Sequence, residues 1–293
     1  MIRLGTRGSA LALAQARQVA AALGDEVELV PITTSGDKVR SGVGDKSRFV
    51  KEIEEALLRG EVDLAVHSAK DVPSELPAGL SIVGVPERAD PYDALCGASS
   101  LDELAGGATL GTASLRRRAQ LLALRPDLDV RDLRGNVDTR LRRLAEGEFA
   151  AVVLAQAGLD RLGRGGEGLP LRELVPAPGQ GCLALEARSD DGRVAAAARA
   201  LTDRTALACL TAERALVDAL GATCRTPIGA HAEMVNGGLR LTAFAGLPDG
   251  SHWIRDFHEG DRSSPASLGR AVAERLETAG AREVLEAAER AAA

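Results

Sequence analysis

Aromatic residues are scarce in this sequence, and their scarcity argues against nucleic acid as a ligand. They make up 2 % of the 293 residues, and none lies between Tyr92 and Phe149. Proteins that bind single strands stack the bases on aromatic side chains, and a net charge of −6 opposes a general surface for polyanions. Because 45 % of the residues are hydrophobic, the chain can bury a core, but that core must consist mainly of Ala, Leu and Val.

Long apolar runs and clustered metal ligands are also missing. No run approaches the ~20 apolar residues of a membrane helix, and the N-terminus has no signal-peptide cleavage pattern. We therefore expect a cytoplasmic protein that binds no membrane. No pair of cysteines has C-x-x-C spacing, and the four histidines do not cluster near them, so neither a metal site nor a disulfide framework is expected. The cysteines are Cys96, Cys182, Cys209 and Cys224.

Lysine is almost absent, and its few positions are concentrated. The chain has 36 Lys and Arg residues, of which only four are Lys, all between residues 38 and 70. An ammonium group is a compact charge that a guanidinium does not reproduce, so these lysines either serve a ligand or lie by chance on a solvated face. Lys70 and Asp71 stand in VHSAKDVPSELP (66–77), after an apolar run and before two prolines that exclude a helix or central strand. This stretch is either a solvated turn or part of a functional site.

The first part of the chain alternates short apolar strands with helices. This rhythm indicates a largely parallel sheet covered by helices. A second α/β unit of the same kind follows, and the strand in GQGCLALEA is predicted to return to the first unit. The first lobe is therefore placed at 1–89 and 182–200, and the second at 90–181. The strands of the first lobe are predicted at 2–5, 27–32, 62–66 and 80–85, and Ser9 is predicted to cap a helix that ends at Leu23.

The C-terminal part has a different sequence pattern. A long helix is predicted at 203–220, and then NGG (236–238) and PDG (248–250) are hairpin signals between alternating segments. Two helices close the chain. We therefore predict a third domain of α+β type at 203–293.

Arginines gather where strands of the second lobe run into helices. Nine lie within residues 116–143, and Ser114 and Asn136 are predicted helix caps. Helix N-termini and guanidinium groups both bind carboxylate or phosphate, which suits a ligand with many negative groups. The alternative is a solvated face with carboxylate partners on the same helix. That alternative fits Arg118, Arg142 and Arg143, whereas Arg116, Arg117, Arg134 and Arg140 stand at the junctions.

One of the four thiols has a polar neighbourhood. Cys224 is flanked by Thr223 and Arg225, and a neighbouring guanidinium favours the reactive thiolate. Local context alone leaves both a reactive and an inert thiol open. No Ser–His–Asp or Cys–His arrangement is readable, so protease-like chemistry has no support.

Ten short motifs are spread along nearly the whole chain. They are RLGTRGSALALAQ (3–15), ITTSGDK (32–38), FVKEIEEALL (49–58), DLAVHSAKDVP (63–73), GTASLRRRAQL (111–121), LRGNVDTRL (133–141), LAQAGLDRLG (154–163), PGQG (178–181), TAERAL (211–216) and CRTPIGA (224–230). Taken together, they resemble the porphobilinogen deaminase family, also called hydroxymethylbilane synthases. The motifs occur in the family's order, which makes the match far more specific than any single motif.

The resemblance implies an activity, a cofactor and a catalytic residue. The family joins four porphobilinogen molecules head to tail into a linear tetrapyrrole and releases ammonia at each addition. Its dipyrromethane cofactor is attached by a thioether to a cysteine that corresponds to Cys224. Asp71 is implied as the catalytic carboxylate, which stabilises the cationic azafulvene and helps to move protons. Lys70, next along an extended segment, would point elsewhere and bind an acidic group.

The remaining site residues follow from the resemblance position by position. The cofactor-binding set is Ser68, Lys70, Thr112, Ser114, Arg116, Arg117, Arg134, Arg140 and Gln180, and the substrate-binding set is Arg7, Ser9, Lys46 and Arg161. The chain departs from the family at residues 46–49, where K-S-R-F replaces K-G-L-F, so the cover formed by residues 39–48 and the role of Lys46 are open. Ala113 and Arg225 replace a usual serine and glutamine.

We therefore expect a monomeric enzyme with two periplasmic-binding-protein-like α/β lobes that face each other across a cleft, and a smaller α+β domain that carries Cys224. The main alternative is a non-catalytic two-lobe protein that binds or senses an anion. That alternative explains the arginines but not Cys224. It also predicts reversible binding without release of ammonia.

Overall fold

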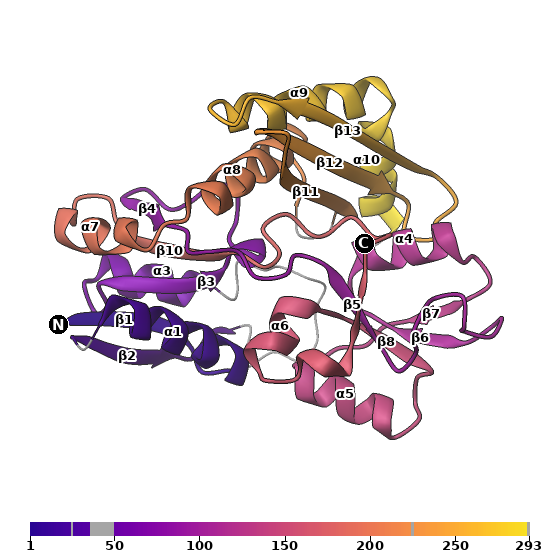
Figure 1. Ribbon diagram of the computed structural model, residues 1–293, viewed down its shortest axis with the longest axis horizontal. Coiled ribbons are helices and arrows are strands. Elements are labelled where there is room, and N and C mark those ends of the chain that lie inside the picture. Colours follow the sequence, from indigo (N-terminus) through magenta and orange to yellow (C-terminus); the bar gives the residue numbers. More distant parts are fainter. Residues whose placement is uncertain (25, 36–49, 224–225, 292–293) are drawn as a thin grey trace. The chain divides into compact units, whose positions relative to one another are not determined.

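The chain folds into two compact units. The computed structural model describes residues 1–24, 26–35, 50–223 and 226–291. One unit comprises Met1–Ala89 with Gly181–Leu210, and the other comprises Asp90–Gln180 with Thr211–Ala293. Each unit contains a five-stranded sheet, and the second also contains a three-stranded sheet (Figure 1). The predicted boundaries of three domains remain a prediction. Every helix of the described segments is too short or too polar to span a membrane.

The first unit is built on a sheet with the strand order β2-β1-β3-β10-β4. Strands β1, β2 and β3 pair in parallel, whereas β10 runs antiparallel to β3 and β4. Helices α1 and α7 bury Val19 and Ala198 on one face, and α3 buries Leu57 on the other. The elements are β1 (Ile2–Arg7), α1 (Ala10–Leu23), β2 (Val27–Ile32), α3 (Lys51–Leu58), β3 (Leu64–Ser68), η2 (Ala69–Asp71), β4 (Leu80–Gly84), β10 (Leu183–Arg188) and α7 (Gly192–Ala200).

The second unit repeats this topology in the order β7-β6-β8-β5-β9. Here β5 is the antiparallel strand, between β8 and β9. Helix α4 buries Leu121 on one face, and α5 and α6 bury Leu141 and Leu159 on the other. The elements are β5 (Asp93–Cys96), β6 (Thr109–Gly111), α4 (Leu115–Leu124), β7 (Asp129–Arg131), α5 (Val137–Ala145), β8 (Ala151–Ala155), α6 (Gln156–Arg161), η3 (Gly165–Glu167) and β9 (Leu169–Leu171).

The two sheets share one feature. In each, the first strand after the chain crosses from the other unit, β10 or β5, is the fourth strand of the sheet and runs antiparallel to both neighbours. This shared topology agrees with the predicted pair of periplasmic-binding-protein-like lobes. The return of the chain to the first sheet through β10 also follows the prediction from GQGCLALEA. The predicted fold class is confirmed.

The C-terminal sheet is antiparallel, in the order β11-β12-β13. Asn236 and Gly237 connect the first two strands with φ angles of 51° and 83°, as a two-residue hairpin requires. Helices α9 and α10 pack against this sheet. The predicted hairpin and closing helices are therefore confirmed. The elements are α8 (Arg204–Ala219), β11 (Ile228–Val235), β12 (Gly238–Gly246), β13 (Trp253–Gly260), α9 (Pro265–Thr278) and α10 (Ala281–Ala291).

Three helices that follow strands begin at the caps that the sequence predicts. Ser9, Ser114 and Asn136 each accept a hydrogen bond from the backbone N–H three residues later, at 3.3, 3.4 and 2.8 Å. Such a cap contributes about 1 kcal/mol to stability. In the second unit, the caps fix where α4 and α5 begin and therefore where their first-turn arginines lie.

Candidate active site

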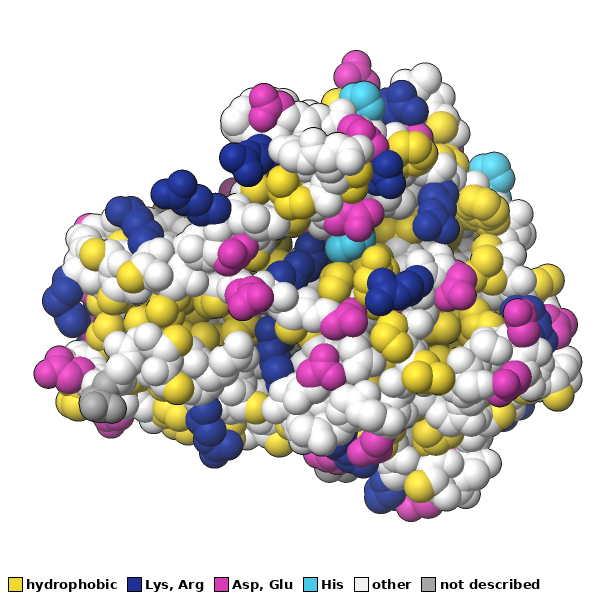
Figure 2. Space-filling view, viewed as in Figure 1, with side chains coloured by type: hydrophobic (Ala, Val, Ile, Leu, Met, Phe, Trp, Pro, Cys, Tyr) yellow, Lys and Arg dark blue, Asp and Glu magenta, His cyan; other side chains and the backbone are white. Residues whose placement is uncertain are grey.

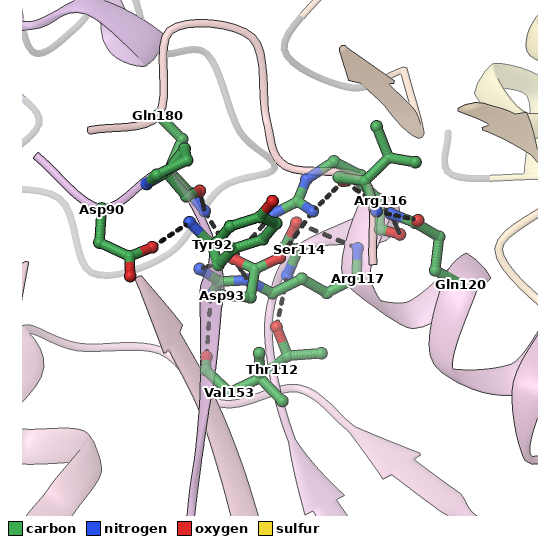
Figure 3. Close-up of polar contacts among 12 residues, drawn as sticks. Asp90, Tyr92, Asp93, Thr112, Ser114, Arg116, Arg117, Gln120, Val153 and Gln180 are labelled. Atoms are coloured by element: carbon green, nitrogen blue, oxygen red, sulfur yellow. Dashed lines mark hydrogen bonds and ion pairs between the residues drawn. The ribbon is translucent and has the colours of Figure 1, made fainter. Parts of the chain in front are cut away.

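A buried carboxylate lies at the centre of a polar cluster in the second unit. Asp93 opens β5 and is 0 % exposed. Its Oδ2 accepts from Arg116 Nη1 at 2.7 Å, and its Oδ1 accepts from Arg117 Nε and Gln180 Nε2, both at 2.9 Å (Figure 3). Burial alone would raise the pKa of Asp93, but the charges of Arg116 and Arg117 outweigh it and hold the pKa well below its usual range. Asp93 is therefore an anion at neutral pH.

Two of the predicted cofactor ligands are largely enclosed by this cluster. Arg116 and Arg117 lie in the first turn of α4 and are 5 % and 6 % exposed. Arg116 Nη1 also donates to Val175 O at 2.7 Å, and Arg117 Nη1 donates to Val153 O at 2.8 Å. Burial lowers the pKa of Arg117, although Asp93 opposes the shift. The two guanidinium groups are thus fixed by internal partners before any ligand binds.

Arg140 differs from this pair because it has no counter-ion within the described part of the chain. It lies in the first turns of α5, and its Nε donates to Gly135 O at 2.8 Å. Burial, and then the neighbouring charge of Arg117, lower its pKa to about 10. Arg140 is partly buried, and a guanidinium that is partly withdrawn from water and close to a second positive charge is stabilised by an anion. Arg140 is therefore suited to a carboxylate of a ligand.

The other predicted residues of the second unit occupy different settings. Thr112 is 2 % exposed, and its hydroxyl oxygen accepts from Ser114 N at 3.2 Å, which leaves the hydroxyl hydrogen to donate. Arg134 is half exposed and lies 3.6 Å from Asp132, and Arg161 ends α6. As the solvated alternative expects, Arg142 and Arg143 form exposed pairs with Glu146 and Glu148. Contacts and charge bring together Thr112, Ser114, Arg116, Arg117, Arg140 and Gln180.

In the first unit, the structure corrects one prediction. The segment with Lys70 and Asp71 is not extended, because Ala69–Asp71 form a short 3₁₀ turn. Val72 N donates to Ala69 O at 3.3 Å, and Ala69 N donates to Cys182 O of the strand entry at 3.0 Å. An extended chain would leave the N–H of Val72 without this partner. The backbone becomes extended again at Val72, before Pro73.

Other predicted residues of the first unit lie at the ends of its parallel strands. Arg7 ends β1 and Ser68 ends β3, and Ser68 Oγ accepts from Gln15 Nε2 at 2.8 Å. The hydroxyl of Ser9 caps α1, so its oxygen already has a structural role. Lys46 and Cys224 lie outside the described residues.

Three ionisable side chains are buried between the first sheet and α3. His67 Nε2 lies 3.0 Å from Glu186 Oε2, with both side chains at most 3 % exposed. Glu54 of α3 is 7 % exposed. Burial raises the pKa of Glu54 to about 7, with a second contribution from the charge of Glu186 and an opposing one from His67. Glu54 is consequently largely protonated in slightly acidic solution.

This raised pKa predicts a pH-dependent stability. In the unfolded chain Glu54 titrates near 4.5, so between about pH 4.5 and 7 only the folded protein keeps the proton, and its stability falls as the pH rises. Glu54→Gln has no titrating group at this position, so its free energy of unfolding should fall by about 2 kcal/mol less than that of the parent chain as the pH rises. This value is smaller than the full pKa shift implies, because the group retains some contact with water. Urea denaturation of both proteins at pH 5 and pH 8 measures the difference.

The matched control is Glu55→Gln on the same helix, whose carboxylate is 46 % exposed. Its stability relative to the parent chain should be the same at the two pH values. If the parent and Glu54→Gln show parallel pH profiles, Glu54 does not titrate as described.

Sequence reasoning missed Asp93, the residue on which the polar cluster depends. The sequence held one signal, because Asp93 directly precedes the apolar residues 94–96, and the structure buries all four residues of this strand. An acidic residue is rarely buried without a cationic partner. The Arg-rich segment 116–143 was the obvious source of that partner.

The contacts described above define the class of this protein. It is an α/β protein whose second unit buries two guanidinium groups, those of Arg116 and Arg117, around the carboxylate of Asp93. Comparison with known proteins then gives the family. Residues 2–196 match the family described as porphobilinogen deaminase, dipyromethane cofactor binding domain, and residues 207–278 match the porphobilinogen deaminase C-terminal domain.

Full-length relatives agree with these matches. Porphobilinogen deaminases from Thiobacillus denitrificans and Thermus thermophilus are 45 % and 48 % identical to this chain, and each alignment covers at least 97 % of both chains. Among solved structures, a substrate-binding domain of a putative amino acid ABC transporter from Streptococcus pneumoniae is a weak match, with 14 % identity, a TM-score of 0.41, and coverage of 75 % of this chain and 94 % of that one.

The chain belongs to the porphobilinogen deaminase family. The predicted family, the enzymatic activity as a transferase and the dipyrromethane cofactor are thereby confirmed. The alternative of a non-catalytic anion-binding protein is not favoured.

Proposed function

We propose that the chain builds the linear tetrapyrrole hydroxymethylbilane by four successive head-to-tail additions of porphobilinogen, with release of ammonia at each addition. The single structural observation that carries this proposal is the cationic site in the second unit. There, Arg140 is partly buried, the nearby charge of Arg117 disfavours its positive charge, and it has no counter-ion among the described residues. Each pyrrole of the substrate and product carries an acetate and a propionate, so a chain of pyrroles supplies the anions that such a site requires.

The described residues fit the dipyrromethane cofactor. Arg140, the N–H groups of Arg116 and Arg117 that have no acceptor within the described part of the chain, and the hydroxyl of Thr112 would hold its carboxylates. Cys224, which lies outside the described residues, would form the thioether. When bound, this group supplies the pyrrole carbon to which the first substrate molecule is joined. The assignment of each residue remains a proposal, and so do the substrate-binding roles of Arg7, Ser9, Lys46 and Arg161.

Asp71 has a different role in this proposal. Loss of ammonia from porphobilinogen leaves a cationic azafulvene, and a carboxylate beside it stabilises the positive charge and exchanges protons with the pyrrole N–H groups. Asp71 ends the 3₁₀ turn that follows β3, and Lys70 precedes it in the same turn. Successive residues of a 3₁₀ helix point about 120° apart, since the helix has about three residues per turn. This geometry lets the ammonium group of Lys70 bind a carboxylate of the ligand while the carboxylate of Asp71 faces the cation.

We also propose that the protein acts in the cytoplasm as a monomer and binds no nucleic acid. On the face shown in Figure 2, Lys and Arg side chains are interspersed with Asp and Glu rather than gathered into one broad basic surface. The net charge of −6 has the same implication.

Incubation with porphobilinogen tests the proposed function. We expect one ammonia per porphobilinogen consumed, together with protein-bound species whose intact masses increase by one pyrrole unit at a time. Ammonia is measured enzymatically and the bound species by mass spectrometry. Reversible binding of porphobilinogen without ammonia would support the non-catalytic alternative and refute the proposal.

A further inference from the structure

The residue Asp93 has no part in the chemistry described above, yet five polar contacts meet at its carboxylate. Besides the three hydrogen bonds already given, Arg116 Nη2 lies 3.1 Å and Arg117 Nη2 lies 2.8 Å from Oδ1. Figure 3 shows the two arginines and Gln180 converging on this one group. With an exposed fraction of 0 %, the carboxylate itself is closed to any ligand.

The arginines held by Asp93 keep part of their hydrogen-bonding capacity. A guanidinium has five N–H donors. In Arg116, two donors reach Asp93 and one reaches Val175 O. In Arg117, two reach Asp93 and one reaches Val153 O. Each group therefore retains two N–H donors whose directions are set by the bonds that the other three make.

The charge of the cluster remains positive after Asp93 is counted. One carboxylate between two guanidinium groups leaves one positive charge, and Arg140 adds a second beside Arg117. Without Asp93, two guanidinium groups would lie side by side in a buried position and repel each other. The carboxylate thus permits two arginines to stay close together without neutralising the site.

Gln180 connects this cluster to the chain that leaves the second unit. Its Nε2 donates to Asp93 Oδ1 and also to Pro91 O at 2.8 Å. Val175, five residues earlier, is held through both backbone groups by Gln120, at 2.6 Å and 3.0 Å. The segment 175–180 and the first turn of α4 are therefore fixed to the start of β5 by side chains rather than by a strand ladder.

We propose that Asp93 is a positioning residue, whose carboxylate fixes Arg116, Arg117 and Gln180 in the arrangement that receives the ligand's carboxylates without touching the ligand itself. The inference rests on the proposed function, because it assigns the arginines to the dipyrromethane and substrate acids. A preformed set of donors binds more tightly than a mobile one, since ordering them costs nothing at the moment of binding. The affinity for the cofactor should consequently depend on where the carboxylate of Asp93 lies, and not only on its charge.

Two substitutions separate position from charge. Asp93→Asn removes the charge, and Asp93→Glu keeps it but moves the carboxylate outward by about one C–C bond, a displacement large enough to spoil a binding geometry. For both we expect the fraction of chains that carry the dipyrrole mass to fall at least about 10-fold. In the chains that carry it, KM for porphobilinogen should rise by a similar factor while kcat changes less. Intact-mass spectrometry and steady-state kinetics measure these quantities.

The matched control is Asp63→Asn in the first unit. Asp63 also holds an arginine with two side-chain hydrogen bonds, from Arg3 at 3.1 and 2.7 Å, and Arg3 is not a candidate site residue. This variant should lose thermal stability but keep the dipyrrole mass. If Asp93→Asn does not fold, Asp93→Glu alone decides, because it leaves no buried guanidinium without a counter-ion.

Three outcomes decide the inference. A folded Asp93→Glu protein with normal cofactor content and normal KM overturns it. Equal loss of cofactor in Asp63→Asn also overturns it, because the effect would then follow from stability alone. A parent chain that consumes porphobilinogen but carries no dipyrrole overturns the cofactor assignment as well, and is recognised before any variant is made.

Discussion

Asp71→Asn is expected to lower turnover by about 10²- to 10⁴-fold, the usual contribution of a positioned acid–base group. Asparagine has nearly the same shape and keeps an oxygen that accepts a hydrogen bond. It has no negative charge to stabilise a cation and no group that exchanges a proton near neutral pH. KM for porphobilinogen should change only a few-fold, because the proposal assigns the binding of the substrate's acids to cationic side chains and not to Asp71. A loss in kcat without a matching change in KM identifies an interaction made in the transition state.

The measurement must separate catalysis from attachment of the cofactor, because a chain without the dipyrrole would be inactive whatever the role of Asp71. We would therefore determine the dipyrrole content of Asp71→Asn by intact mass and follow a single addition of porphobilinogen only in chains that carry it. Glu75→Gln is the matched control, because it removes an exposed carboxylate four residues further along the same segment. Its turnover should equal that of the parent chain. Near-normal turnover of Asp71→Asn would show that the proposed role is wrong.

The features predicted correctly from the sequence are those that depend on neighbours along the chain. Ser9, Ser114 and Asn136 cap helices because each side chain reaches a backbone N–H only three residues away. The turn at Asn236 and Gly237 is equally local. Such signals place helices and hairpins, and they place the first-turn arginines of α4 and α5.

The contacts of the candidate site depend on the register of distant strands. Asp93 is 23 residues from Arg116 and 87 residues from Gln180 along the chain. They meet because β5 is inserted antiparallel between β8 and β9, and no local pattern encodes that insertion. The buried set of Glu54, His67 and Glu186 likewise requires β10 to enter the first sheet beside β3. Composition and spacing therefore indicated a cationic site without the carboxylate that organises it.

The incorrect prediction of an extended backbone at Lys70 and Asp71 has a similar cause. Pro73 and Pro77 favour an extended chain around themselves, and the prediction extended that preference to residues 70 and 71. The N–H of Ala69 instead bonds to Cys182 O of the returning chain. A tertiary hydrogen bond thus begins the turn at Ala69, three residues before Val72, the residue that Pro73 restricts.

Cys224→Ser is expected to abolish both the attached cofactor and the activity. The purified parent chain should be heavier than its sequence by one dipyrrole, and the variant should have the mass of the bare sequence. A serine hydroxyl does not provide the thiolate from which a thioether forms. Porphobilinogen turnover should fall to the level seen without enzyme, while circular dichroism shows a folded protein. The comparison requires intact-mass spectrometry and an ammonia assay on the same preparations.

The other three cysteines provide the matched controls and make Cys224 the best candidate. Cys96, Cys182 and Cys209 are buried thiols, at most 4 % exposed. Burial, followed by the charge of Glu167, raises the pKa of Cys96 to about 11, which makes it a poor nucleophile at neutral pH. Cys209→Ser should therefore keep the extra mass, although a hydroxyl in its buried position costs some stability. If Cys224→Ser keeps that mass and Cys209→Ser loses it, the thioether has been assigned to the wrong cysteine. A fully active parent chain with no extra mass would exclude a covalent cofactor altogether.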